Sequence, residues 1–304
     1  MTSTIDGARR IRQGRLTGPS RAIDRRITAV RDDLADVALA GTVTAPRYAE
    51  AVRRAAVATA AVIHAEPRDD AVAVSMVLHG EVFDVLEVVG GAAGWAWGQC
   101  RHDGYVGWVR TAQLGPVATV THRVSVPAAT VFTAPSIKAR VAGTLPLNAG
   151  LAATTAADLP FVAAAGGYVH RRHVVPLGTW HNDPVAVALG FAATPYVWGG
   201  RTRAGIDCSG LTQAALLACG IFCPRDSDQQ GDAFAVVDEA DRRRGDLVLF
   251  PGHVGILLDA DTLLHANAHW MTTLAEPLAE VAARLAPTGY RRPPVVVATP
   301  CSGG

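Results

Sequence analysis

The fold is decided by the stretch Tyr196-Val-Trp-Gly-Gly-Arg-Thr-Arg-Ala-Gly-Ile-Asp-Cys208-Ser-Gly-Leu211. Its paired glycines permit a tight turn, a short polar loop follows, and an apolar run then begins. The run from Leu211 to Cys219 predicts a helix that ends at Gly220, a usual C-terminal capping residue. Cys208 is therefore expected in the first turn of a helix, where unpaired backbone N–H groups and the helix dipole favour the thiolate.

A predicted hairpin downstream carries two histidines. Strand side chains alternate between faces, so His253 and Gly255 share one face. If the turn consists of Asp259–Asp261, His265 lies opposite Gly255 and diagonally next to His253, within side-chain reach. A turn of two or four residues would place the two histidines on opposite faces. In the favourable register Asn267 lies opposite His253 and is a second candidate for orienting it.

These residue types suit nucleophilic catalysis. A thiolate needs a base and a group that orients the base. We therefore expect Cys208 to attack a carbonyl, His253 to take and return the proton, and His265 to hold the His253 imidazole. The oxyanion would form near the helix N-terminus, where the Cys208 backbone N–H is available. A lone cysteine or histidine is more often a core or structural residue, so the prediction depends on their combination.

Composition limits the other function classes. The chain has 304 residues, enough for two or three compact domains, and a net charge of +1 that argues against nucleic-acid partners. Its first residues lack the apolar core of a secretory signal and no apolar run could span a membrane, so we expect no membrane partner and a cytoplasmic location. Five scattered cysteines are not a disulfide framework, and Cys219 and Cys223 are expected to be core thiols rather than zinc ligands. We expect no metal and no cofactor.

The pattern of residue types along the chain predicts four segments. Residues 1–60 form an Arg-rich arm, mobile or draped over the surface to about residue 30, and a short helical region over residues 48–60. Short alternating runs separated by Gly or Asp turns predict a small β-barrel over residues 61–116. A less regular repeat of this pattern predicts a second barrel over residues 117–178. The alternative is one irregular β region with a long linker. Residues 179–304 mix helices and strands and contain Cys208, so the fold class is α+β.

Two sets of motifs carry family resemblances. The motifs His79-Gly80-Glu81, Gly94-Trp95 and Asp103-Gly-Tyr-Val-Gly-Trp-Val109 resemble a bacterial SH3-like domain. Further on, the chain resembles the NlpC family of papain-like cysteine peptidases in Pro195-Tyr-Val-Trp-Gly-Gly, Asp207-Cys-Ser-Gly-Leu, Pro224-Arg, Gly245-Asp-Leu-Val-Leu-Phe, His253-Val-Gly-Ile and His265-Ala. The resemblance implies a papain-like NlpC catalytic domain preceded by one or two SH3-like barrels. It also implies cleavage of bacterial wall peptides between γ-D-glutamate and the diamino acid, with Cys208, His253 and His265 as the catalytic residues.

A narrower resemblance is to the members that recycle wall peptides and need a free N-terminal L-alanine. It implies that the partners are short peptidoglycan stem peptides. The substrate pocket would be formed by Asp207, Ser209, Asp226, Ser227 and Tyr196, with Glu81 and Tyr105 reaching in from the first barrel. The alternatives are that Glu81 and Tyr105 are ordinary barrel residues and that Asp207 is only a helix N-cap.

Three other functions stay open on the sequence. The chain could be a wall-remodelling or lytic endopeptidase whose SH3-like domains bind polymer, or a wall-binding adaptor without catalysis. Acyl transfer to lipid on a similar Cys-His framework is disfavoured, because no membrane-seeking stretch is present.

Overall fold

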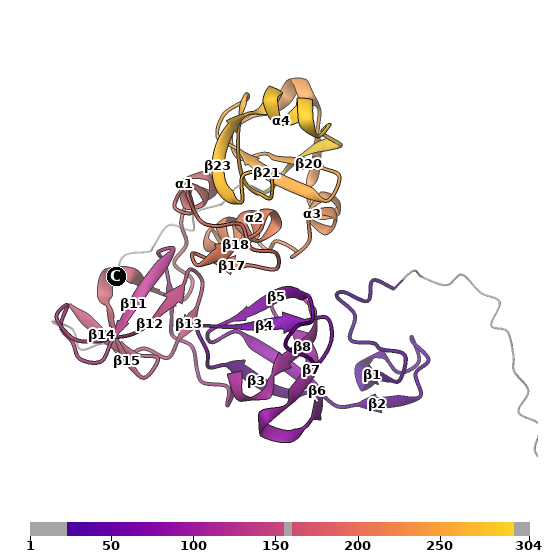
Figure 1. The fold of residues 1–304 in the computed structure, drawn as a ribbon, viewed down its shortest axis with the longest axis vertical. Helices are drawn as coiled ribbons and strands as arrows, with labels where there is room; N and C mark the ends of the chain where they lie inside the picture. Colours follow the sequence, from indigo (N-terminus) through magenta and orange to yellow (C-terminus); the bar gives the residue numbers. More distant parts are fainter. Residues whose placement is uncertain (1–22, 155–159, 295–304) are drawn as a thin grey trace, which may run out of the picture.

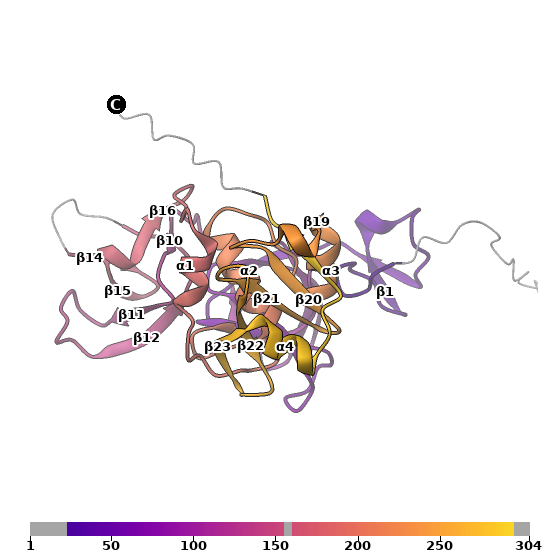
Figure 2. The same cartoon turned by 90° about the horizontal axis from the view of Figure 1, so that it is seen from above.

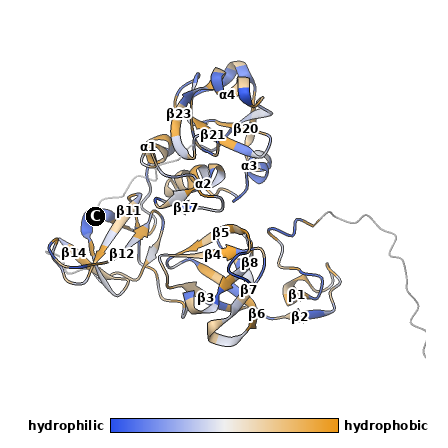
Figure 3. Ribbon diagram, viewed as in Figure 1, coloured by the Kyte–Doolittle hydropathy of each residue, from blue (hydrophilic) through white to orange (hydrophobic). Residues whose placement is uncertain are grey.

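The computed structural model describes residues 23–154 and 160–294. Along the chain, a small N-terminal strand pair is followed by two β units and then by a unit that contains all four α-helices of the described residues (Figure 1). Figure 2 shows the same units from above, with α2 over the first barrel. Hydrophobic residues gather on the barrel strands, whereas α3 is hydrophilic (Figure 3). No helix in the described ranges is long and apolar enough to cross a membrane.

The N-terminal segment forms a small strand pair. β1 (Leu34–Asp36) pairs in parallel with β2 (Arg47–Ala49), and Ala29 and Val30 are buried, so from residue 23 onward the arm packs on the protein, as the surface-draped alternative expects. The rest of the arm, residues 1–22, lies outside the described residues. The helix expected over residues 48–60 is wrong.

Tertiary packing explains why the helix expected over residues 48–60 does not form. The segment forms β3 (Val52–Ala56), which pairs with β6 and β9 and buries Ala55 and Ala56 in the barrel. Small side chains suit this crowded interior, and this packing overrides the helix propensity of alanine. The first barrel therefore begins at Val52 rather than at residue 61.

The first barrel is a seven-stranded sheet in the order β5-β4-β8-β7-β6-β3-β9. Its core is formed by inward-facing apolar residues such as Ile63, Val77 and Phe83. Its other strands are β4 (Ala60–His64), β5 (Ala73–Leu78), β6 (Val82–Val89), β7 (Trp95–Cys100), β8 (Val106–Arg110) and β9 (Leu114–Gly115).

The second β unit repeats the pairings of the first. In each unit the first strand pairs with the fourth and the seventh, the second with the third and the sixth, and the fifth with the sixth. It has a separate apolar core around Val131, Leu145 and Val169. Its strands are β10 (His122–Val124), β11 (Ala128–Phe132), β12 (Val141–Pro146), β13 (Gly150–Leu151), β14 (Phe161–Ala164), β15 (Gly167–His170) and β16 (Val174–Pro176).

The C-terminal unit packs α2 (Cys208–Ala218) against β21 and β22 of a six-stranded sheet in the order β19-β24-β20-β21-β22-β23. α2 contains the expected helical run except its last residue, Cys219, which is the C-cap; the helix begins at Cys208, and Gly220 follows the cap at a φ of 76°. The other elements are α1 (Pro184–Leu189), β17 (Arg201–Thr202), β18 (Gly205–Ile206), α3 (Ser227–Ala233), β19 (Ala235–Val237), β20 (Leu247–Phe250), β21 (His253–Leu257), β22 (Thr262–Asn267), β23 (Thr272–Pro277), α4 (Leu278–Arg284) and β24 (Gly289–Arg292).

Both β units dock on the C-terminal unit and on each other. From the second unit, Arg123 donates to the carbonyls of Thr179 and Ala218, and Asn148 donates to Ala214 O. The two β units meet where Gly150 N donates to His79 O at 2.8 Å. A Cβ at the neighbouring Gly80 would lie 2.3 Å from Gly150 O, so this contact requires a glycine.

Candidate active site

Cys208 is the first residue of α2, and Asp207 is its N-cap. The Asp207 carboxylate accepts from Gly210 N at 2.7 Å, which satisfies one of the free donors of the first turn. The backbone N–H groups of Val254 and Ser209 hydrogen-bond to the Cys208 sulfur. Because Val254 directly follows His253, the sulfur lies beside the start of β21.

The two histidines lie side by side on their hairpin. Leu258 N donates to Thr262 O, and Ile256 and Leu257 pair with Leu264 and Leu263, so the turn is the one expected at residues 259–261. His253 Nε2 lies 2.9 Å from His265 Nδ1, and the ring centroids are 5.1 Å apart. The hairpin register inferred from the alternation is therefore the register of the structure.

The glycine between them has a different neighbour from the one expected. A Cβ at Gly255 would lie 2.7 Å from Leu263 Cδ1, so Gly255 makes room for that leucine and not for an imidazole. Asn267 does not pair with His253, because its amide donates to Glu276 Oε2 at 3.1 Å.

Glu276 on β23 is the residue that the sequence analysis missed. Its Oε2 accepts from His265 Nε2 at 2.8 Å, and its Oε1 accepts from Trp270 Nε1 and Arg284. A proton on His265 Nε2 leaves Nδ1 to accept from His253 Nε2–H, which in turn leaves His253 Nδ1 unprotonated. The only sign of Glu276 in the sequence is the period-2 pattern of the strand after His265. That pattern places Glu276 on the face of His265 only if the length of the turn at residues 268–271 is known.

Burial dominates the charges of these groups. It raises the pKa of the Cys208 thiol to about 11, with a further contribution from Asp207, and outweighs the backbone donors at the sulfur. It lowers the pKa of His253 to about 4, with His265 acting in the same direction. Burial raises the pKa of Glu276, but the donors Trp270, His265 and Arg284 outweigh it and bring the pKa to about 2. Without substrate the thiol and the imidazole are thus both neutral, which corrects the expectation of a resting thiolate.

A cavity of about 320 Å³ opens above Cys208. Its wall combines residues of the C-terminal unit with residues of the first barrel and of the N-terminal segment. These residues are Arg26, Val74, Tyr105, Trp198, Asp207, Cys208, Ser209, Arg225, Asp226, Ser227, Asp228 and Gly252. Five of the seven expected pocket residues are therefore brought together, the exceptions being Glu81 and Tyr196.

Asp226 is the partly buried carboxylate of this cavity. Tyr105 donates its hydroxyl to Asp226 Oδ2 at 3.2 Å, and Arg26 donates to the same oxygen at 2.9 Å. Burial raises the pKa of Asp226, although Arg225 and Arg26 oppose the shift. Ser227 opens α3 directly after it and borders the cavity.

Asp207 and Ser209 are already bound to Arg225, a second residue that the sequence analysis left unassigned. Arg225 is 1% exposed and donates to both Asp207 oxygens, at 3.0 and 2.6 Å. It also donates to Ser209 Oγ and, from the first barrel, to Ser75 Oγ. Asp207 therefore caps α2 and neutralises a buried guanidinium, and it has no free charge for a ligand.

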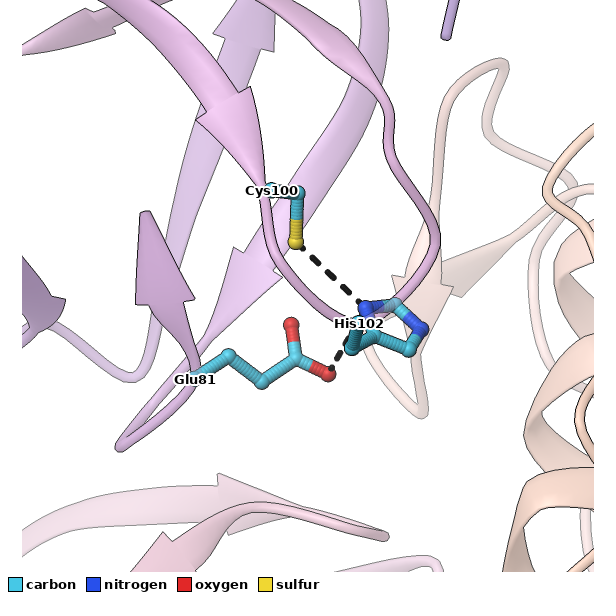
Figure 4. Close-up of side chains that lie close together, drawn as sticks. All are labelled: Glu81, Cys100 and His102. Atoms are coloured by element: carbon cyan, nitrogen blue, oxygen red, sulfur yellow. Dashed lines mark hydrogen bonds and ion pairs between the residues drawn. The ribbon is translucent and has the colours of Figure 1, made fainter. Parts of the chain in front are cut away.

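Glu81 lies outside the cavity wall, against the expectation from the resemblance. Its carboxylate accepts from Arg201 at 2.8 and 3.0 Å and from Leu78 N. Glu81 lies close to Cys100 and His102 (Figure 4), with potential metal-ligand atoms within 4.8 Å of one another. The buried Arg201 already provides the cation for Glu81, and its NH2 lies 3.2 Å from His102 Nε2, so this cluster does not suit a metal ion.

Tyr196 is half-buried and is not among the residues that line the cavity. It packs against the core cluster that contains Cys208, and burial raises the pKa of its hydroxyl.

Comparison with known protein families matches two segments. Residues 193–280 match the NlpC/P60 family, and residues 63–114 match the bacterial dipeptidyl-peptidase SH3 domain. In structure, the chain is similar to an NlpC/P60 family protein from Bacillus cereus, with a TM-score of 0.69, 19% identity, and coverage of 79% of this chain and 99% of the other. That likeness concerns the fold.

Two curated relatives are more similar in sequence over shorter segments. Dipeptidyl-peptidase 6 of Lysinibacillus sphaericus is 36% identical over 96 residues, which cover 31% of this chain and 35% of that protein. The gamma-D-glutamyl-L-lysine dipeptidyl-peptidase of Bacillus subtilis is 29% identical over 130 residues, covering 36% of this chain and 44% of that protein. The matches thus span less than half of either relative. The expected α+β fold is confirmed: the chain contains a papain-like NlpC/P60 domain preceded by a bacterial SH3 domain.

Proposed function

We propose that the protein is a cysteine peptidase that hydrolyses the γ-D-glutamyl–diamino acid bond of short peptidoglycan-derived peptides with a free N-terminal L-alanine. The observation that carries the proposal is the hydrogen-bonded row Glu276–His265–His253. The residue after His253, Val254, directs its backbone N–H to the sulfur of Cys208 at the N-terminus of α2. A cavity lies over that sulfur. The names of both curated relatives support a dipeptidyl-peptidase, and that of the Bacillus subtilis relative supports cleavage after γ-D-glutamate.

The row of hydrogen bonds defines the role of each catalytic residue. His253 Nδ1 makes no hydrogen bond among the described residues and is the atom that accepts the Cys208 proton. The sulfur then attacks the γ-carbonyl carbon, and His253 returns the proton to the leaving amine of the diamino acid. Water hydrolyses the resulting thioester and regenerates the thiol. His265 and Glu276 hold the imidazole in the required tautomer and stabilise its protonated form during transfer.

The cavity also suits a substrate with a free amine. Asp226 shares the cavity with Cys208, and a partly buried carboxylate binds an ammonium group strongly. Tyr105 supplies a hydroxyl from the first barrel. We place the L-alanine ammonium at Asp226, with Ser209 and Ser227 lining the wall between it and the scissile carbonyl.

Mass spectrometry of the products from L-Ala-γ-D-Glu-diaminopimelate tests this proposal. The expected products are L-Ala-γ-D-Glu and free diaminopimelate, with no cleavage when the amine is acetylated. The Cys208→Ala variant is expected to release neither product. If Cys208→Ala cleaves as fast as the wild type, Cys208 is not the nucleophile; the turnover would then point to a contaminant, and a wall-binding adaptor without catalysis would be favoured over the peptidase.

The second candidate is a peptidase that acts on the intact wall. It is distinguished by incubating the protein with purified sacculi and with the free tripeptide at equal concentrations of cleavable bonds. Recycling predicts strong preference for the tripeptide, and comparable rates would favour the wall-acting enzyme. A role in the recycling of wall peptides also predicts that the protein is located in the cytoplasm, which cell fractionation tests.

A further inference from the structure

Arg26 is a basic residue in the wall of the Cys208 cavity that the proposed chemistry does not use. It comes from the N-terminal segment, about 200 residues away in sequence from the carboxylates that it binds. Its backbone is attached to the first barrel, because Val106 N donates to Arg26 O and Gln99 donates to Ile27 O, both at 2.8 Å. The segment therefore connects the barrel to α3 across one end of the cavity.

The Arg26 guanidinium is fully engaged. NH1 donates to Asp226 and Asp228 at 2.9 Å, NH2 donates to Asp228 at 2.7 Å and to Asp24 at 2.8 Å, and Nε donates to Asp24 at 3.0 Å. These contacts use all five N–H donors of the side chain. Three carboxylates together hold this guanidinium against the wall of the cavity.

A second cavity lies on the other side of this residue. It has a volume of about 490 Å³, and Arg26, Val74 and Tyr105 line both cavities. Its remaining wall includes Trp97 and Trp108, against which the guanidinium of Arg31 stacks at 4.6 and 5.0 Å from the ring centroids. Arg26 thus separates the space above Cys208 from a groove that could accept a longer chain.

We propose that Arg26 determines substrate specificity by closing the amine end of the cavity, so that a peptide extended or acylated at its N-terminus does not fit. The inference rests on the proposed function, which places the substrate amine at Asp226. With Arg26 only 2.9 Å from Asp226 Oδ2, an acyl group on that amine would meet the guanidinium. Because three carboxylates share one guanidinium, the site keeps an excess of negative charge that attracts an ammonium but not a neutral amide.

The test compares kcat/KM for L-Ala-γ-D-Glu-diaminopimelate and for its N-acetyl derivative. In Arg26→Ala the acetylated-to-free ratio is expected to rise at least about tenfold over wild type, because the end wall is removed. Arg26→Met keeps the reach of the side chain but not its anchoring, and it is expected to give an intermediate ratio. If the alanine variant does not fold, the comparison of Arg26→Met with wild type tests the proposal. The matched control is Arg68→Ala, whose side chain is exposed, pairs with Glu66 and Asp70 and lines neither cavity, and both constants should stay unchanged.

The two possible failures are distinct. If wild-type protein does not cleave the free tripeptide, the proposed function is wrong and this inference falls with it. If wild type cleaves the tripeptide but the ratio is the same in wild type, Arg26→Ala and Arg26→Met, only the role of Arg26 is wrong. An equal rise in Arg68→Ala would also overturn it, because the effect would then be one of surface charge.

Discussion

At the scale of single residues, burial favours the neutral forms of Cys208, the proposed nucleophile, and of His253, the proposed base. Burial keeps the pKa of Cys208 near 11 and that of His253 near 4. A thiol and an imidazole in this state exchange a proton only when the substrate carbonyl is attacked, so base catalysis must coincide with bond formation. The orientation of His253 then matters more than its resting charge, and that orientation depends on His265 and Glu276.

Replacing Glu276 by Gln is expected to lower kcat about tenfold to a hundredfold with a small change in KM, because the amide no longer selects the required His265 tautomer. Steady-state kinetics on the free tripeptide measure this. The control is Glu280→Gln, an exposed carboxylate on α4, which should leave kcat unchanged. Equal losses in both variants would show that Glu276 has no special link to catalysis.

The pH profile follows from the same groups. As the pH falls from 6.5 towards 4, the unfolded chain binds a proton at His253 that the native protein does not, so stability declines. We expect kcat/KM to fall on the same side as His253 becomes protonated near pH 4, and again near pH 8, where an α-amino group of pKa about 7.7–8.0 loses its charge. A rate that keeps rising through pH 9 would show that thiol ionisation controls the reaction and not the substrate amine.

At the scale of elements, α2 depends on its N-cap and on the charge that the cap neutralises. Asp207 accepts from Gly210 N and Gly199 N, and both of its oxygens bind the buried Arg225. This one carboxylate therefore holds the start of α2, the glycine turn before α2, and Arg225, which lies just before α3. The position of the Cys208 sulfur is therefore coupled to a buried ion pair.

The Asp207→Asn variant is expected to lower the free energy of unfolding by about 3–5 kcal/mol, because the Arg225 guanidinium is left buried without its partner. Urea denaturation followed by circular dichroism measures the change. Asp183→Asn is the matched control, since Asp183 caps α1 at an exposed position and its loss should cost about 1 kcal/mol or less. Similar losses in the two variants would mean that the cap, and not the buried charge, is what matters at Asp207.

At the scale of the whole molecule, the active-site cavity is shared between units. Tyr105 and Ser75 from the first barrel reach Asp226 and Arg225, and Arg26 closes the wall from the N-terminal segment. The barrel is held against the C-terminal unit by a second buried ion pair, Glu81–Arg201. Docking of the barrel is thus part of building the site.

Replacing Arg201 by Met is expected to destabilise the protein by about 3–5 kcal/mol, because it strands the Glu81 carboxylate at the interface. The Glu81→Gln/Arg201→Met double variant should recover most of that loss, since neither charge is then left alone. Denaturant unfolding of both variants gives the two values. A double variant no more stable than Arg201→Met would show that the pair is not the source of the effect.

Local sequence was informative where short-range rules apply. The Cys208 helix with its glycine stop follows from adjacent residues, and the proximity of His253 and His265 follows from strand alternation and a three-residue turn. The helix expected over residues 48–60 failed because its alanines are used in a barrel core built from strands distant in sequence.

The fold class, the position of Cys208 at the start of its helix and the proximity of the two imidazoles follow from the amino-acid sequence alone, because each depends on residues within one or two adjacent elements. Only the tertiary structure decided that Glu276 completes the row, that Arg225 takes the charge of Asp207, that Glu81 turns to Arg201, and that Arg26 closes the cavity. These contacts come from the packing of separate strands and units, and which carboxylate meets which guanidinium is set by docking geometry that no local pattern encodes.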